Sequence, residues 1–351
     1  MIRARSLALC TLLAGCAGAP TDAGTDGPSF GKAPPPPPAE AAAQILESPA
    51  AASFVNGASG TGLLTGRVTT ACGVFGPAFW DRAGHLTTLP AVAGTCGGIG
   101  QAVNGSGVVV GTAYNGTQAA GAVRWTPATD GYIADRLPAL PNGKDSGPWS
   151  VNEDGWISSG NAAAVWTPAD GWHLLTLPAG ATGCGYTNVG NSGQAVSSCT
   201  IAGVTQGVFW ETLDGAPVVL PLPPRGVRGF ANGINTGGTI AGFVTATDVS
   251  YRAVRWTRSG TEWTVQTLPD LGQGAGAQAI NDDGDVVGSV YAGRNGSAQP
   301  AYWDANGALH LLDPQRGGEA TAISNRSGGL VVGGYAIFST KIGKQAARWL
   351  P

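Results

Sequence analysis

A tryptophan at the end of a short apolar run recurs seven times in this chain of 351 residues. Successive copies are 45, 41, 44, 46, 47 and 46 residues apart, and the residue two places before each tryptophan is always Ala or Val. In a strand these two positions share a face, so the small residue leaves room for a large ring from a neighbour. The period indicates repeated units that bury their faces against one another. The tryptophans are Trp80, Trp125, Trp166, Trp210, Trp256, Trp303 and Trp349.

Two further elements recur with the tryptophan. One is a strand closed by proline, as in HLTTLP, HLLTLP and VQTLP, and proline ends a strand because it cannot donate to the ladder. The other is an apolar residue followed by Asn, which precedes a turn and a short strand. These pairs are Val55-Asn56, Val103-Asn104, Val151-Asn152, Ile234-Asn235 and Ile280-Asn281. Glycines bracket that strand as G-x-x-x-G in five copies: Gly62 to Gly66, Gly107 to Gly111, Gly238 to Gly242, Gly284 to Gly288 and Gly329 to Gly333.

The repeats predict an all-β fold, a seven-bladed β-propeller. A unit of ~44 residues has the length of one blade with about four strands. The body begins with a proline-closed strand, at residues 44–49, that no tryptophan strand precedes, and it ends at ARWLP. We expect these fragments to share one blade and to close the ring, which removes exposed sheet edges. An open stack of repeats is the alternative, but it would need capping units.

The first fifteen residues read as a secretory signal peptide, with arginines before a short apolar run. The stretch Leu13-Ala14-Gly15-Cys16 resembles a bacterial lipobox, which implies lipidation of Cys16; an ordinary signal peptide is the alternative. Ala17, where an aspartate would imply inner-membrane retention, points to the outer membrane, at its cell-surface or periplasmic face. Residues 16–43 are rich in Ala, Gly and Pro and are expected to form a disordered tether. The propeller would occupy residues 44–351.

The unit AVRWT…LP…AQAINDDGDVVGS resembles the bacterial HAF repeats of extracellular and lipoprotein chains. The resemblance covers nearly all of residues 44–351, with Pro77-Ala78-Phe79 closest to the His-Ala-Phe that names the family. It implies export and a repeated architecture, and it offers no catalytic residues.

The acidic stretch NDDGD, at residues 281–285, raises the question of a calcium site. Other copies carry Gly105-Ser106 or Thr236-Gly237 where this one has Asp282-Asp283, so the carboxylates are optional. The twelfth position of a calcium loop, counted from the start of the stretch, also lacks its glutamate. Because Asn followed closely by Gly recurs, we predict a turn and no metal.

Neither a catalytic centre nor a cofactor is predicted. The three histidines, His85, His173 and His310, fall in different repeats and so should lie apart. Four cysteines follow the export segment, and four cysteines allow three pairings. We favour Cys72 with Cys96 and Cys184 with Cys199, because each pair lies within one repeat length.

Trp149, Trp156 and Trp172 depart from the repeated position and are candidates for a ligand surface, or for local packing. With a net charge of −3, no nucleic-acid partner is expected. We therefore favour a monomeric, lipid-anchored binding or scaffold protein that presents propeller loops to a glycan or an envelope protein. The alternative is a propeller enzyme, a hydrolase or lyase of extracellular polysaccharide, in which acids outside the repeat, such as Asp145 or Glu262, would act.

Overall fold

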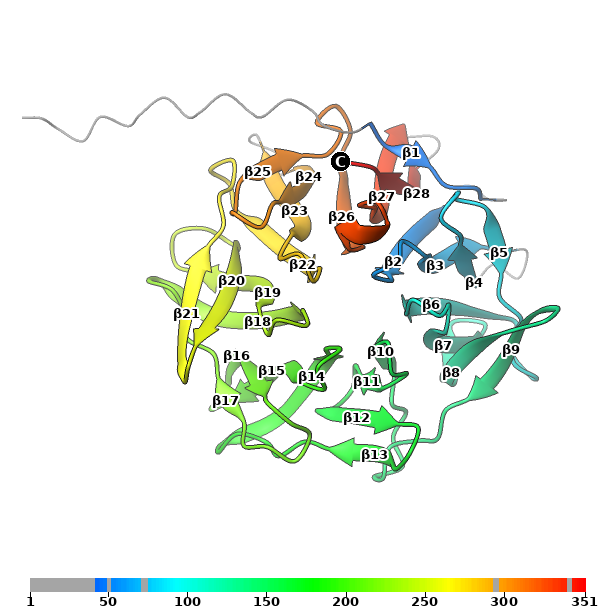
Figure 1. The fold of residues 1–351 in the computed structure, drawn as a ribbon, viewed down its shortest axis with the longest axis horizontal. Helices are drawn as coiled ribbons and strands as arrows, with labels where there is room; N and C mark the ends of the chain where they lie inside the picture. Colours follow the sequence, from blue (N-terminus) through cyan, green and yellow to red (C-terminus); the bar gives the residue numbers. More distant parts are fainter. Residues whose placement is uncertain (1–41, 49–51, 71–74, 293–296, 340–342) are drawn as a thin grey trace, which may run out of the picture. The chain divides into compact units, whose positions relative to one another are not determined.

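The computed structural model describes residues 42–48, 52–70, 75–292, 297–339 and 343–351. It forms seven four-stranded antiparallel sheets, which are the blades of a β-propeller (Figure 1). The predicted fold class and blade number are therefore confirmed. The signal peptide, Cys16 and nearly all of the tether lie outside the described residues and stay predictions.

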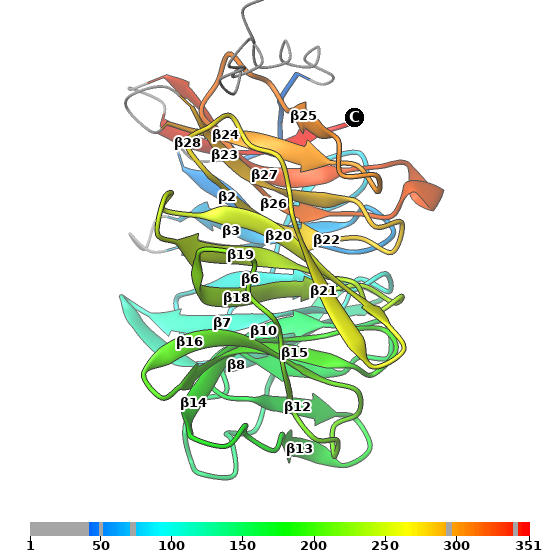
Figure 2. The same ribbon diagram turned by 90° about the vertical axis from the view of Figure 1, so that its left-hand side faces the viewer.

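Blades are numbered in chain order, and their strands run from the innermost outward. The first three are β2 (Ser53–Ala58), β3 (Leu64–Thr69), β4 (Phe75–Trp80), β5 (Leu86–Thr88); β6 (Gly97–Val103), β7 (Val109–Asn115), β8 (Gln118–Ala128), β9 (Gly131–Arg136); and β10 (Pro148–Val151), β11 (Ile157–Ser159), β12 (Ala164–Thr167), β13 (Gly171–Leu174). The next three are β14 (Ala181–Val189), β15 (Ala195–Ile201), β16 (Val204–Trp210), β17 (Val218–Val219); β18 (Gly226–Ile234), β19 (Ile240–Ala246), β20 (Arg252–Ser259), β21 (Glu262–Thr267); and β22 (Ala275–Ile280), β23 (Val286–Ala292), β24 (Ser297–Trp303), β25 (Leu309–Leu311). Figure 2 faces blade 5, with β21 in front of its inner strands.

Blade 7 joins the two ends of the propeller. It consists of β26 (Gly318–Ile323), β27 (Val332–Ser339), β28 (Gly343–Trp349) and, as its outermost strand, β1 (Gln44–Ile45); a short 3-10 helix (Arg326–Gly328) lies between β26 and β27. Strand β1 pairs antiparallel with β28, Gln44 opposite Arg348, as the blue and red arrows of Figure 1 show. The Ala346 amide also donates to Ser53 Oγ of blade 1, 2.9 Å away. The predicted ring closure by shared end strands is confirmed.

In three blades the repeated tryptophan donates a hydrogen bond to the carbonyl of the repeated proline. Trp256 Nε1 donates to the Pro221 carbonyl at 2.7 Å, and Trp303 Nε1 donates to the Pro269 carbonyl at 2.8 Å. Each indole thus binds the chain that leaves the preceding blade. Both rings are fully buried. The proline therefore does more than end a strand, because its carbonyl accepts from the next blade.

Two register predictions are corrected by the structure. In the first repeat the turn begins at Ser59, whose Oγ accepts from the Leu63 amide, whereas Asn56 lies inside β2. In the seventh repeat the longer turn shifts the second glycine by one place. Gly334, not Gly333, pairs with Ala320 in the position that Gly288 occupies opposite Ala277. An added 3-10 helix explains the shift.

Candidate functional site

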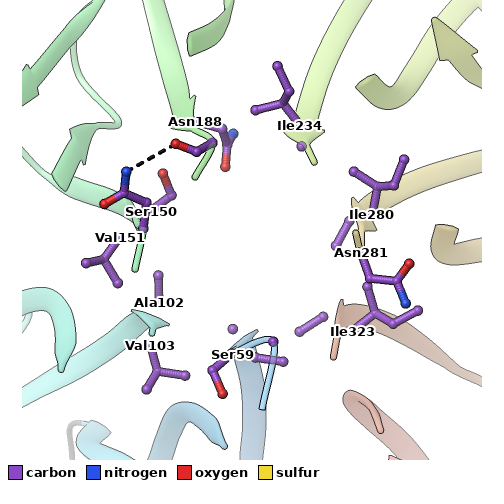
Figure 3. A pocket seen from close by; sticks show the side chains of 18 of the residues that line it. Ser59, Ala102, Val103, Ser150, Val151, Asn188, Ile234, Ile280, Asn281 and Ile323 are labelled. Carbon is purple, nitrogen blue, oxygen red and sulfur yellow. Dashed lines mark hydrogen bonds between the residues drawn. The ribbon is translucent and has the colours of Figure 1, made fainter. Parts of the chain in front are cut away.

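The seven innermost strands surround a central cavity of about 350 Å³, to which every blade contributes (Figure 3). The apolar residue before each turn forms one zone of its wall: Val103, Val151, Val189, Ile234, Ile280 and Ile323. Amide side chains form the other zone: Asn56, Gln101, Asn188, Asn232 and Gln278. No lysine, arginine or histidine is among the lining residues. The wall is therefore polar and carries no positively charged side chain.

A repeated β-bulge brings polar side chains to the cavity. In five blades the pairing of the two inner strands skips one residue of the innermost strand, and such a bulge bends the strand and re-aims a side chain. The skipped residues, all of which line the cavity, are Asn56, Gln101, Asn232, Gln278 and Thr321. Sequence analysis missed this set, although a polar residue three places before the turn-start residue was its signal.

Glycine in the second strand makes room for the bulge. A Cβ at Gly288 would lie 2.0 Å from the Gly276 carbonyl oxygen, a contact that no side chain tolerates. The same clash would arise at Gly66, Gly111, Gly242 and Gly334, at 1.9 to 2.0 Å. The second glycine of G-x-x-x-G therefore fills a packing requirement.

Some cavity side chains also bind neighbouring blades. Asn56 Nδ2 donates to the Gly100 carbonyl and Asn232 Nδ2 to the Ala277 carbonyl, both at 2.8 Å. Thr321 Oγ1 donates to the Val55 carbonyl at 2.7 Å across the ring closure. Within the described residues, the Gln101 and Gln278 amides make no such bond, although Asn56 and Asn232 show that this position can. Their donors and acceptors face the cavity unused.

The asparagine that starts each turn links consecutive blades. Asn281 Oδ1 accepts from the Asp285 amide of its own turn at 2.8 Å, while its Nδ2 donates to the Ser324 carbonyl of the next blade at 2.9 Å. Asn104, Asn152 and Asn235 make the same pair of bonds. These four side chains are buried, so the bonds are shielded from water. The asparagine is thus a structural element of the ring.

The next residue forms a second set of inter-blade bonds, which uses the cavity's two carboxylates. Glu153 accepts from the Gly105 amide at 2.8 and 3.0 Å. Asp282 accepts from the Thr236 amide at 2.8 Å and from Asn325 Nδ2 at 3.0 Å. Burial raises the pKa of Asp282, but these hydrogen bonds outweigh it and hold the pKa below its usual value. Asp282 is therefore a charged hydrogen-bond acceptor at neutral pH.

The remaining residues of the NDDGD stretch also make hydrogen bonds within the protein. Gly284 has a φ of +87° and donates to the Asn281 carbonyl, which confirms the predicted turn. Asp285 is fully buried and receives Arg326 Nε at 2.7 Å and Nη2 at 2.5 Å. Tyr302 Oη donates to the same carboxylate at 3.2 Å, and burial and Asp285 raise the pKa of Tyr302 to about 12. No group of three or more metal-binding side chains is found among the described residues.

The three tryptophans of the predicted ligand surface lie in different places. Trp149 lines the central cavity and packs edge-on against Tyr186, with ring centroids 4.9 Å apart. Trp156 lines a second cavity of about 480 Å³, which also contains Asp170 and His173. Trp172 lines neither cavity, and its Nε1 donates to the Pro138 carbonyl at 2.9 Å, as the repeated tryptophans do in other blades. Only Trp149 therefore faces the central cavity.

The histidines lie in separate blades and each faces a nearby aspartate: His85 with Asp81, His173 with Asp170 and His310 with Asp304. Cys184 and Cys199 form a disulfide between adjacent strands, as predicted. Cys96 is exposed, but its predicted partner Cys72 lies outside the described residues, so that pairing stays a prediction.

Comparison with known proteins relates the chain to propellers by fold alone. No family model and no curated protein matches it. The virginiamycin B lyase from Staphylococcus aureus matches 89% of the chain and 100% of its own length, with TM-score 0.54 and 15% identity. YCF48 bound to D1 peptide matches 89% of the chain and 95% of its own length, with TM-score 0.54 and 13% identity. A puromycin hydrolase matches 88% of the chain and 55% of its own length, with TM-score 0.54 and 15% identity.

Within the described part of the chain, no helix is long and apolar enough to cross a bilayer.

Proposed function

We propose that this protein is a lipid-anchored binding or scaffold protein of the bacterial outer membrane, whose propeller binds a glycan or an envelope protein. The lipobox-like Leu13-Ala14-Gly15-Cys16 supports the anchor, and the Ala/Gly/Pro-rich tether would hold the propeller away from the lipid. An N-acyl chain and a diacylglyceryl group on Cys16 would supply the several chains that stable attachment needs.

The central cavity carries the binding half of the proposal. Amides offer both donors and acceptors, and the unused amides of Gln101 and Gln278 face an apolar wall that includes Ile280. Neutral hydroxyl-rich or amide-rich ligands match such a surface, because every ligand group can find a partner without a buried charge. Trp149 adds an aromatic face, on which a sugar ring or an apolar side chain can pack.

The same cavity favours binding over catalysis. A glycoside hydrolase needs one carboxyl group that donates a proton and a second that acts as base or nucleophile. The only carboxylates of the wall are Glu153 and Asp282, and both accept hydrogen bonds that hold neighbouring blades together. An acid that is committed in this way is a poor proton donor, so a hydrolytic role lacks its chemistry here.

The binding proposal is tested with the soluble body, from residue 43 onward, on an array of envelope glycans. Gln101→Ala with Gln278→Ala should weaken binding of the retained glycan about tenfold, since two ligand hydrogen bonds are lost. Gln118→Ala, an exposed glutamine of the same blade as Gln101, should leave binding unchanged. Cleavage products in the bound fraction would instead establish the enzyme, and equal binding by all variants would exclude the cavity.

The anchoring half is tested by fractionation of cells. The full chain should sediment with outer membranes and carry fatty acid, whereas Cys16→Ala should appear in the soluble fraction without it. Export of an unlipidated, soluble wild-type chain would refute the anchor while leaving the binding proposal open to its own test.

A further inference from the structure

Three arginines that stack on aromatic rings in this propeller also face a carboxylate, whereas Arg67 stacks on rings without one. Arg124 lies over Trp166 and faces Asp135, Arg258 lies over Phe209 and Trp263 and pairs with Glu211, and Arg316 lies over Phe338 and pairs with Asp313. Arg67 lies 4.5 Å from the ring centroid of Phe54 and 4.7 Å from that of Phe75. Its guanidinium makes no hydrogen bond or ion pair with any described residue.

The missing partner is not a carboxylate of the propeller. Every aspartate and glutamate from residue 42 onward is among the described residues. Arg67 Nε is buried without a partner, and burial lowers the pKa of the guanidinium from its ordinary value. The rest of the side chain is partly exposed, so an anion from outside the propeller can reach the guanidinium and supply the ion pair that the other stacked arginines have.

The arginine lies on the side of the ring opposite the turns, beside the start of the innermost strand of blade 1. Strand β2 runs from Ser53 toward the turn at Ser59, so Phe54 is at the far end, two residues before the cavity residue Asn56. Arg67 is opposite Phe54 in β3. Strands β2 and β27 of adjacent blades lie side by side in Figure 1, and the rings of Phe54 and Tyr335 contact at 5.5 Å.

Further aromatic rings form a series of contacts in blades 5 and 6. Phe230 stacks on Phe243 at 4.6 Å, Phe243 contacts Tyr251 at 5.5 Å, and Tyr251 contacts Tyr291 at 6.2 Å. Burial and then the charge of Glu319 raise the pKa of both Tyr291 and Tyr335, so this carboxylate lies near both rings. We call the set Phe230, Phe243, Tyr251, Tyr291, Tyr335, Phe54 and Phe75 the aromatic arc; it spans blades 5, 6, 7 and 1.

We propose that the aromatic arc binds an acidic polysaccharide, and that Arg67 pairs with a carboxylate of one of its sugar units. This inference rests on the proposed binding function and names its ligand class. Partly exposed rings such as Tyr251 provide faces for successive sugars, while tyrosine hydroxyls and Lys344, which donates to Tyr335 Oη at 3.1 Å, provide polar contacts. A planar guanidinium fixed by two phenyl rings is preorganised for bidentate carboxylate binding.

A series of rings over four blades favours a polymer over a single charged group. One peptide C-terminus would satisfy Arg67 but would leave the rest of the arc uncovered. A chain of uronic acid units would place one carboxylate at Arg67 and stack neighbouring units on the remaining rings, with hydroxyls and not a second carboxylate beside Glu319. The ligand class therefore follows from the extent of the aromatic surface together with one unpaired cation.

The test compares oligogalacturonate with its methyl ester, which removes only the charge, by calorimetry on the soluble body. The acid should bind at least tenfold more tightly, and Arg67→Gln should remove that advantage, a loss of about ten- to hundredfold. The affinity of Arg67→Lys for the acid should lie between those of the wild type and Arg67→Gln, because lysine keeps the charge but cannot make the two parallel hydrogen bonds of a guanidinium. The matched control, Arg258→Gln, removes a stacked arginine that already has Glu211 and should bind like the wild type.

Each other outcome has a definite meaning, provided that thermal unfolding shows the variants folded. Equal binding of acid and ester, unaffected by Arg67→Gln, would overturn this inference and leave glycan binding intact. Binding of a peptide C-terminus in preference to oligogalacturonate, lost in Arg67→Gln, would keep the anion site and overturn the polysaccharide. If no glycan binds at all, both the inference and the glycan arm of the proposed function fail.

Discussion

The buried indoles allow one hydrogen bond to be measured against a built-in control. Trp256 and Trp349 are equally buried and lie in equivalent strands, β20 and β28. Trp256 Nε1 donates to the Pro221 carbonyl at 2.7 Å, whereas Trp349 Nε1 has no partner among the described residues. The equivalent carbonyl, that of Pro314, is approached by Gln299 Nε2 at 3.5 Å instead.

Replacing each tryptophan with phenylalanine should therefore cost very different amounts. Both variants lose the same ring volume and the associated packing. Trp256→Phe also loses a hydrogen bond, which contributes about 1 kcal/mol net, while Trp349→Phe removes a buried donor whose lack of a partner costs about 2 kcal/mol. The expected gap in the free energy of unfolding is about 3 kcal/mol, or roughly 6 °C in Tm, with Trp256→Phe the less stable.

The gap is measured on the soluble body by thermal and urea unfolding, followed by far-ultraviolet circular dichroism because the substitution removes a fluorophore. Trp303→Phe, whose indole also has its carbonyl partner, should behave like Trp256→Phe. Equal losses at the two sites, or a larger loss at Trp349, would refute the idea that the indole bond to the preceding blade stabilises the ring.

Three further predictions concern single groups. Burial raises the pKa of Asp285, but hydrogen bonds from Arg326 and other donors outweigh it and lower the pKa. The stabilising contribution of the charged carboxylate is therefore present at neutral pH and should be lost as pH falls below about 4. In Asp285→Asn, Tm should fall less steeply than in the wild type over this acidic range. Reduction of the disulfide between Cys184 and Cys199, which are 15 residues apart, should lower stability by about 3 kcal/mol, whereas an unchanged urea midpoint would show that the bond carries no stability. Gly288→Ala, whose Cβ would meet a carbonyl oxygen at 2.0 Å, should cost several kcal/mol, against about 0.5 or less for Gly276→Ala, which has open space; equal Tm values would contradict the packing role.

Much of the fold could be predicted from the sequence because the residues that pack each blade recur at a regular spacing. The spacing of the tryptophans gave the blade number, and the incomplete units at the two ends predicted their pairing in blade 7. What the pattern could not give is register inside a unit. Asn56 was aligned with the turn asparagines, yet the turn starts at Ser59, because a serine oxygen can accept the same backbone bond. Residues of different types that make the same hydrogen bond are not recognised as equivalent when repeats are aligned by residue identity.

The candidate site was harder to predict for a physical reason. Its side chains reach the cavity through a β-bulge, which breaks the alternation on which strand patterns depend. Trp149 was identified only as an aromatic outside the repeat, although it stands three residues before Asn152, where other blades place Gln101 or Asn232. Arg67 gave no signal at all, since an unpaired arginine is recognised only when the partners of the others are known.

The repeat itself offers a way to separate structural from functional polar groups in such a ring. A polar residue that recurs and bonds to the next blade, as Asn281 does, is accounted for by the architecture and is a poor candidate for a ligand. The informative residues are those in equivalent places whose bond is missing. Gln101 and Gln278 stand where Asn56 and Asn232 reach a neighbouring carbonyl, and Arg67 stacks as other arginines do without their carboxylates. The amides of Gln101 and Gln278 are open to the cavity, and the buried Nε of Arg67 has no partner, so all three side chains are placed to bond a ligand that arrives from outside.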